Sequence, residues 1–126
     1  MSLRSYRYNS EWMPDDFPHD YDAHIYFSLD QLAFVQALRK KICHHFKTDQ
    51  IFVGDIIPES IGPHTLPMLE VNFSKSLYAE MIAWLATERG LLNILVHPQS
   101  GDDYFDHTQG AQWLGHPVNL KLEVFR

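Results

Sequence analysis

The chain has 126 residues, of which 45% are hydrophobic and 21% are charged, and its formal net charge is -6. This length is typical of a single domain that can bury a core. The acidic balance argues against nucleic acid and anionic membranes as partners, because both bind basic surfaces. The single cysteine, Cys43, excludes an intrachain disulfide and a zinc site built from several cysteines.

The sequence predicts an irregular arm rich in aromatic side chains over residues 1–20 and a single domain over residues 21–126. The first twenty residues include Glu11, Asp15 and Asp16 and hold no continuous apolar run, so they do not resemble a signal peptide. A run of about 18 apolar residues, which a membrane span needs, is also absent from the sequence. We therefore expect a cytoplasmic protein without a membrane span.

Alternation of apolar and polar residues, or a short apolar run, predicts five strands. They cover residues 22–29, 51–57, 66–73, 91–97 and 118–124. Two stretches with apolar residues at helical spacing lie between them. The first begins after Ser28 and Gln31, which have the spacing of a capping box, and the second begins after Ser74 and ends at Gly90.

The resulting order of strand, helix, strand, strand, helix and strand is typical of an α+β, ferredoxin-like fold. We expect an antiparallel sheet with both helices on one face, plus an extra C-terminal strand. In this fold the first four strands lie in the spatial order 4-1-3-2, so the first strand has the third and fourth as its neighbours.

Three polar side chains are predicted to meet at one end of this sheet. His24 lies near the start of the first strand, Glu70 near the end of the third, and His97 at the end of the fourth. Each has the opposite parity to the apolar residues of its strand, so all three face away from the helices. Neighbouring strands lie about 4.8 Å apart, which allows the three side chains to converge on one metal ion.

Two histidines and one carboxylate form the ligand set of non-haem Fe(II) oxygenases, although imidazole also suits Zn²⁺. Each residue also has a purely structural alternative. His24 could be a half-exposed sheet residue, Glu70 could pair with a basic side chain, and His97 could hydrogen-bond the next loop.

Two more histidines are candidates for the same site. Simple topology places His64 at the far end of the sheet, but Gly62 and Pro63 bend its loop, which could fold back over the open face. We therefore hold His64 as a reserve ligand or acid–base group. His107 follows Asp106 in the loop after the fourth strand and is the candidate for handling protons.

Several blocks of the sequence resemble the DOPA 4,5-dioxygenase family over roughly residues 20–122. The blocks are residues 21–27, 62–64, 69–71, 95–103, 106–108 and 113–115. Two positions depart from the expected family sequence. Thr65 stands where proline is expected, and Asp22 stands where histidine is expected, which removes one potential ligand.

The resemblance implies extradiol cleavage of a catechol, such as L-DOPA, by O₂ at a non-haem Fe²⁺ site, with Zn²⁺ as an alternative metal in the purified protein. Such a pocket needs apolar walls for the ring, and Tyr26, Met68 and Leu95 share the open face of the sheet. These three residues are therefore the predicted substrate contacts, while His107 and His64 are the predicted catalytic groups.

Two alternatives from other classes remain. The chain could be a non-catalytic, ferredoxin-like dimer that binds a small molecule on its open sheet face, or a zinc-dependent hydrolase or isomerase on the same ligands. The aromatic N-terminal arm and the open sheet face both need a covering surface, which favours a homodimer.

Overall fold

The structure, a computed structural model, describes residues 20–125. In chain order the elements are β1 (Tyr21–Tyr26), η2 (Leu29–Gln31), α2 (Leu32–His45), β2 (Ile51–Ile57), β3 (Met68–Phe73), η3 (Lys75–Leu77), α3 (Tyr78–Glu88), β4 (Asn93–Pro98), α4 (Asp103–Asp106), β5 (Gln112–Leu114) and η4 (Leu122–Phe125). Apart from Asp20, the predicted N-terminal arm lies outside the described residues, so the division into an arm and a domain stays a prediction.

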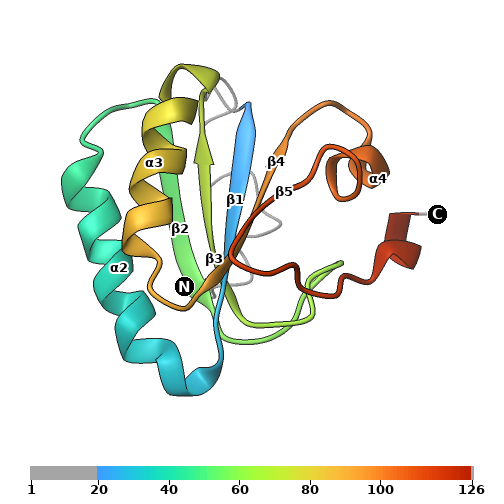
Figure 1. Ribbon diagram of the computed structural model, residues 1–126, viewed down its shortest axis with the longest axis horizontal. Helices are drawn as coiled ribbons and strands as arrows, with labels where there is room; N and C mark the ends of the chain where they lie inside the picture. Colours follow the sequence, from blue (N-terminus) through green and yellow to red (C-terminus); the bar gives the residue numbers. More distant parts are fainter. Residues whose placement is uncertain (1–19, 126) are drawn as a thin grey trace.

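The five strands form one antiparallel sheet in the order β2-β3-β1-β4-β5. Helices α2 and α3 lie side by side along one face of this sheet, and α4 and the C-terminal segment lie on the other side (Figure 1). The predicted α+β fold and the order of its first four strands are confirmed. No helix within residues 20–125 has the length and apolar composition to cross a membrane.

The main core lies between the sheet and the two long helices. Alternate strand residues supply one side of it, among them Ala23, Ile25, Leu69, Val71, Ile94 and Val96, and all of these are buried. Helical spacing supplies the other side through Val35, Leu38 and Ile42 of α2 and Met81 and Leu85 of α3. This packing fixes which residues of β1, β3 and β4 must point away from the helices.

A second, smaller apolar cluster covers part of the opposite face. Its fully buried members are Tyr26, Ile57, Met68 and Leu95, and partly buried residues such as Trp113, Val118 and Leu120 pack against them. The face away from the helices is therefore apolar near the end of β1 and polar near its start, where the candidate ligands lie.

The fifth strand lies at a different place from the predicted one. Strand β5 (Gln112–Leu114) pairs with β4, while residues 118–124 contain a single bridge, between Leu120 and His64, followed by η4. The prediction of a strand over residues 118–124 is therefore wrong. Because Val118 and Leu120 pack on the second apolar cluster, their alternation reflects one-sided packing of a segment without a ladder of its own.

Candidate functional site

The polar end of the sheet is built from directly paired residues of its three central strands. In the register of β1 with β3, His24 lies opposite Glu70 and Asp22 lies opposite Asn72. In the register of β1 with β4, Asp22 lies opposite His97. His24, Glu70 and His97 thus share one end and one face of the sheet, as their parity in the sequence predicts.

His24 lies at the centre of this group. Its Nε2 is 3.0 Å from Nε2 of His97, and its Nδ1 is 3.5 Å from Oε1 of Glu70. Nδ1 of His97 is 2.8 Å from the carbonyl oxygen of Pro98. All three side chains are buried, so each of these short contacts is made in a medium where electrostatic interactions are strong.

Amide groups hold the two buried carboxylates. Asn72 Nδ2 donates to Oε2 of Glu70 at 2.8 Å and also to Oδ1 of Asp22. Gln99 Nε2 donates to Oδ2 of Asp22, and the same oxygen is 3.7 Å from Nε2 of His97. These donors fix the orientation of both carboxylates relative to the histidines.

His64 reaches the same site because its loop folds back over the sheet. Gly62 takes a φ of 59°, a left-handed conformation that favours glycine, and Ile61 and His64 exchange two backbone hydrogen bonds across this turn. The ring of His64 then lies 4.1 Å from that of His24, between centroids, and its Nδ1 is 2.6 Å from Oη of Tyr26. Simple topology had placed His64 at the far end of the sheet, and the bend at Gly62 is the reason that it lies elsewhere.

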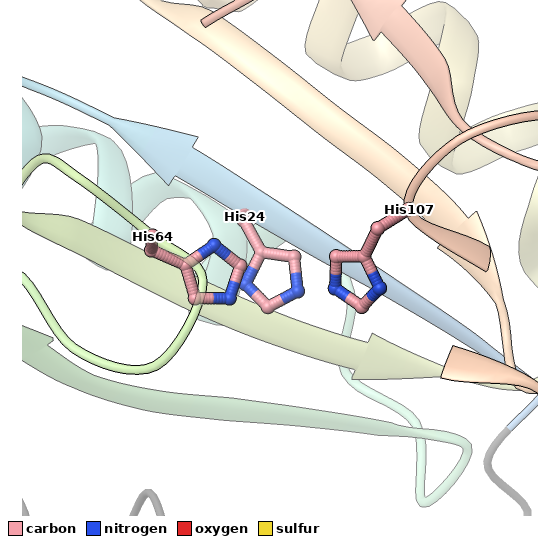
Figure 2. A group of neighbouring side chains, drawn as sticks. All are labelled: His24, His64 and His107. Carbon is pink, nitrogen blue, oxygen red and sulfur yellow. The ribbon is translucent and has the colours of Figure 1, made fainter. Parts of the chain in front are cut away.

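His107 closes the group from the loop after β4. In Figure 2 the rings of His64 and His107 lie on either side of His24. The centroid of the His107 ring is 4.3 Å from that of His97, and Nδ1 of His107 is 2.8 Å from the carbonyl oxygen of Asp103. Burial of the ring, followed by the charge on His97, lowers the pKa of His107 and favours its neutral form.

The aspartates of this loop shape it. Asp102 caps α4 by accepting a hydrogen bond from the backbone N–H of Phe105 at 3.0 Å. The buried carboxylate of Asp106 accepts hydrogen bonds from the backbone N–H and the hydroxyl of Ser100. The loop that carries His107 is therefore held by local hydrogen bonds.

The four histidines open onto a cavity of about 310 Å³. Its other polar lining comes from Asp22, Glu70, Gln99 and Asp103, and its apolar walls are Ile61, Pro63 and Phe125. Within the described residues, two groups of potential ligand atoms lie within 4.8 Å of one another: His24, His64 and His107, and Asp22, His24 and His97. His24 belongs to both groups, and Glu70 belongs to neither.

The predicted substrate contacts occupy a different position. Tyr26, Met68 and Leu95 are 2%, 0% and 0% exposed, and they form the second apolar cluster. The residues that line the cavity do not include them. They lie beneath the site, where Tyr26 reaches it through its hydrogen bond to His64.

Three residues of the site were not predicted: Asn72, Gln99 and Phe125. Asp22 was treated only as the loss of a potential ligand, yet its carboxylate lies in a group of potential ligands with His24 and His97. Asp22 and Asn72 carried a usable signal, because they have the same parity as His24 and Glu70 on their strands. Phe125 carried none, because it directly follows residues 118–124, which were predicted as a strand. Its ring lies tilted against that of His107, with 36° between the ring planes and 4.7 Å between centroids.

The donors fit a metal ion by their chemistry. Carbonyl oxygens accept hydrogen bonds, so Nδ1 of His97 and Nδ1 of His107 must donate to Pro98 and Asp103. Their Nε2 atoms are then left as lone-pair donors. Neutral imidazole of this kind, together with a carboxylate, is the ligand set that iron and zinc use in proteins.

Comparison with known proteins identifies the family. The sequence profile of the Dopa 4,5-dioxygenase family matches residues 21–124. A protein of Botryotinia fuckeliana, described as an uncharacterized 21.2 kDa protein, is 32% identical over 98% of this chain and 72% of its own length. The DOPA 4,5-dioxygenase of Amanita muscaria is 31% identical over 77% of this chain, which corresponds to 46% of that protein.

A solved structure gives the same result. The crystal structure of a protein from Nostoc punctiforme, described as a "putative dioxygenase", matches with a TM-score of 0.78 and 30% identity. The match covers 84% of this chain and 90% of that chain. Together, the family profile, the relatives and the shared fold show that the chain belongs to the DOPA 4,5-dioxygenase family.

Proposed function

We propose that the protein is an extradiol dioxygenase that opens the ring of a catechol, such as L-DOPA, with O₂ at a non-haem Fe²⁺ site. Membership in the family supports oxygenase activity. The observation that supports the more specific proposal, extradiol cleavage at an Fe²⁺ site, is the buried cluster of histidines and carboxylates around one cavity. Its volume of about 310 Å³ suits a small aromatic ligand.

His24 and His97 are the proposed histidine ligands. The sequence predicts Glu70 as the carboxylate ligand, while Asp22 is the carboxylate that lies in a donor group with both histidines. When bound, iron at such a site provides open positions for the catechol oxygens and O₂ and conducts electrons between them. Both atoms of O₂ enter the ring-opened product.

His64 and His107 are the proposed acid–base groups. A catechol must lose a proton to bind as the catecholate, and a neutral imidazole beside the cavity can accept it. Tyr26 holds the ring of His64 through the 2.6 Å contact to Nδ1. Ile61, Pro63 and Phe125 supply the apolar surface that the catechol ring needs.

The test is anaerobic reconstitution with Fe(II), followed by addition of O₂ and either L-DOPA or a simpler catechol. We expect a yellow ring-opened product and consumption of one O₂ per catechol. His24→Ala should abolish both signals, while His44→Ala, an exposed histidine of α2, should keep them. Absence of product with every catechol, from a protein that also binds no metal, refutes the proposal.

The other function classes give different results in the same experiment. A zinc-dependent hydrolase or isomerase retains zinc and consumes no O₂. A non-catalytic binding module keeps its affinity for a small aromatic ligand when His24 and His97 are both replaced by alanine. A homodimer in the cytoplasm stays our proposal for the assembly and its location, and light scattering tests the assembly.

A further inference from the structure

We infer that Glu70 is a positioning residue, held by Asn72, that fixes His24 with its proton on Nδ1 and so presents Nε2 to the metal. This inference rests on the proposed metal site and deepens it. It gives the predicted carboxylate ligand a different task, since Glu70 then acts through His24 and does not bind the ion itself.

The two oxygens of Glu70 have different partners. Oε2 accepts the 2.8 Å hydrogen bond from Asn72, and Oε1 lies 3.5 Å from Nδ1 of His24. Glu70 and Asn72 are 6% and 0% exposed, so water has little access to either contact. The carboxylate is thus held in place from one side and faces the imidazole with its other oxygen.

This placement selects one tautomer of His24. A carboxylate at ion-pair distance from Nδ1 favours a proton on that nitrogen, which leaves the lone pair on Nε2. Nε2 of His24 is the atom that lies 3.0 Å from Nε2 of His97. Because the two ring nitrogens point in different directions, Glu70 lies on the side of His24 that faces away from this contact.

His97 is held in the same way by a different acceptor. Its Nδ1 donates to the carbonyl oxygen of Pro98, so its Nε2 also carries a lone pair. Two lone pairs that meet at 3.0 Å repel each other unless a positive charge lies beside them. A metal ion bound by both Nε2 atoms supplies that charge, and Asp22 Oδ2, 3.7 Å from Nε2 of His97, is the carboxylate oxygen on that side.

Glu70→Gln separates the two roles of Glu70 sharply. Asn72 can donate only to an oxygen, so the new amide must offer its oxygen to Asn72 and its NH₂ group to His24. His24 then accepts at Nδ1 and carries its proton on Nε2, the wrong tautomer for binding the ion. The matched control is Glu80→Gln, which removes an exposed Glu–His contact between α3 and α2, Glu80 Oε2 to His45 Nε2 at 3.3 Å.

The first measurement is Co(II) binding, followed by its visible absorption bands. We expect Glu70→Gln to raise the Kd for Co(II) by about 10- to 100-fold, the usual effect of removing a group that orients a ligand. The band positions should not change, because the ligands stay the same. A Kd within twofold of the unaltered chain, or bands that shift because a ligand has been lost, overturns the inference.

The second measurement needs no metal. At a pH of about 8.5, where an ordinary histidine is neutral, ¹H–¹⁵N correlations of the imidazole rings should show His24 with its proton on Nδ1. In Glu70→Gln the proton should lie on Nε2, and in Glu80→Gln it should stay on Nδ1. A proton on Nε2 of His24 in the unaltered chain overturns the inference. An unaltered chain that binds neither Co(II) nor Fe(II) refutes the proposed function instead, and the tautomer still decides the role of Glu70.

Discussion

Replacing Tyr26 with phenylalanine removes a single oxygen atom from the layer beneath the cavity. That oxygen lies 2.6 Å from Nδ1 of His64. Tyr26 and His64 are 2% and 4% exposed, so water cannot readily replace the lost partner. The aromatic ring stays, together with its packing against Met68, Leu95 and Trp113.

The expected effect is therefore the loss of one buried hydrogen bond, between Oη of Tyr26 and Nδ1 of His64. Such a loss costs about 1–3 kcal/mol of the free energy of unfolding. Activity should fall as well, because the ring of His64 loses the contact that orients it. Metal affinity should stay close to that of the unaltered chain, since His24 and His97 are untouched.

Urea denaturation of four proteins, the unaltered chain, Tyr26→Phe, His64→Ala and the double variant, measures this contact. We expect a coupling energy of about 0.5–3 kcal/mol between the two positions, as for other residues in direct contact. Tyr78→Phe, which removes an exposed hydrogen bond to Gln112, is the control and should change stability by less than about 0.5 kcal/mol. Strictly additive effects of Tyr26→Phe and His64→Ala would refute the reasoning.

Four further variants and one measurement of stabilisation by metal test the site. His24→Ala and His97→Ala should each abolish retention of Fe(II), measured as metal content after anaerobic loading; a full complement of metal in either would contradict the proposed ligands. Phe125→Ala should raise KM for catechols about tenfold through lost apolar contact, with unchanged Co(II) affinity; an unchanged KM would remove Phe125 from the substrate wall. Met68→Ala should lower the free energy of unfolding by about 2–5 kcal/mol in urea while the folded protein still binds Co(II). Metal at 100 times its Kd should stabilise the unaltered chain by about 2.7 kcal/mol; thermal denaturation with and without Co(II) measures this, and no shift would mean that the native state does not bind the ion.

The alternation of apolar and polar residues along the strands made most of the sheet predictable. The residues of β1, β3 and β4 alternate because one face of each strand packs on α2 and α3, and this parity also placed His24, Glu70 and His97 on the opposite face. The order of the first four strands then followed from the fold class. The sequence alone therefore predicted where the polar end of the sheet lies.

The walls of the cavity depend on long-range contacts and were not predictable in the same way. Residues 118–124 alternate like a strand, yet β5 occupies the edge of β4, and Val118 and Leu120 of this segment pack on the second apolar cluster instead. The position of Phe125 follows from that packing. Likewise, the fold-back of His64 depends on the left-handed turn at Gly62 and on the bridge to Leu120, which lies 56 residues further along the chain.

The central position of β1 has a consequence for how the protein acquires its metal. His24 lies on this strand, and apart from Asp22 its partners in the two donor groups are residues 64, 97 and 107, which lie far from it in the sequence. Contacts of such sequence separation form late, because each requires closure of a long loop. Metal binding should therefore coincide with completion of the sheet. The rate at which the Co(II) absorption bands appear during refolding would then report the rate of the last step of folding.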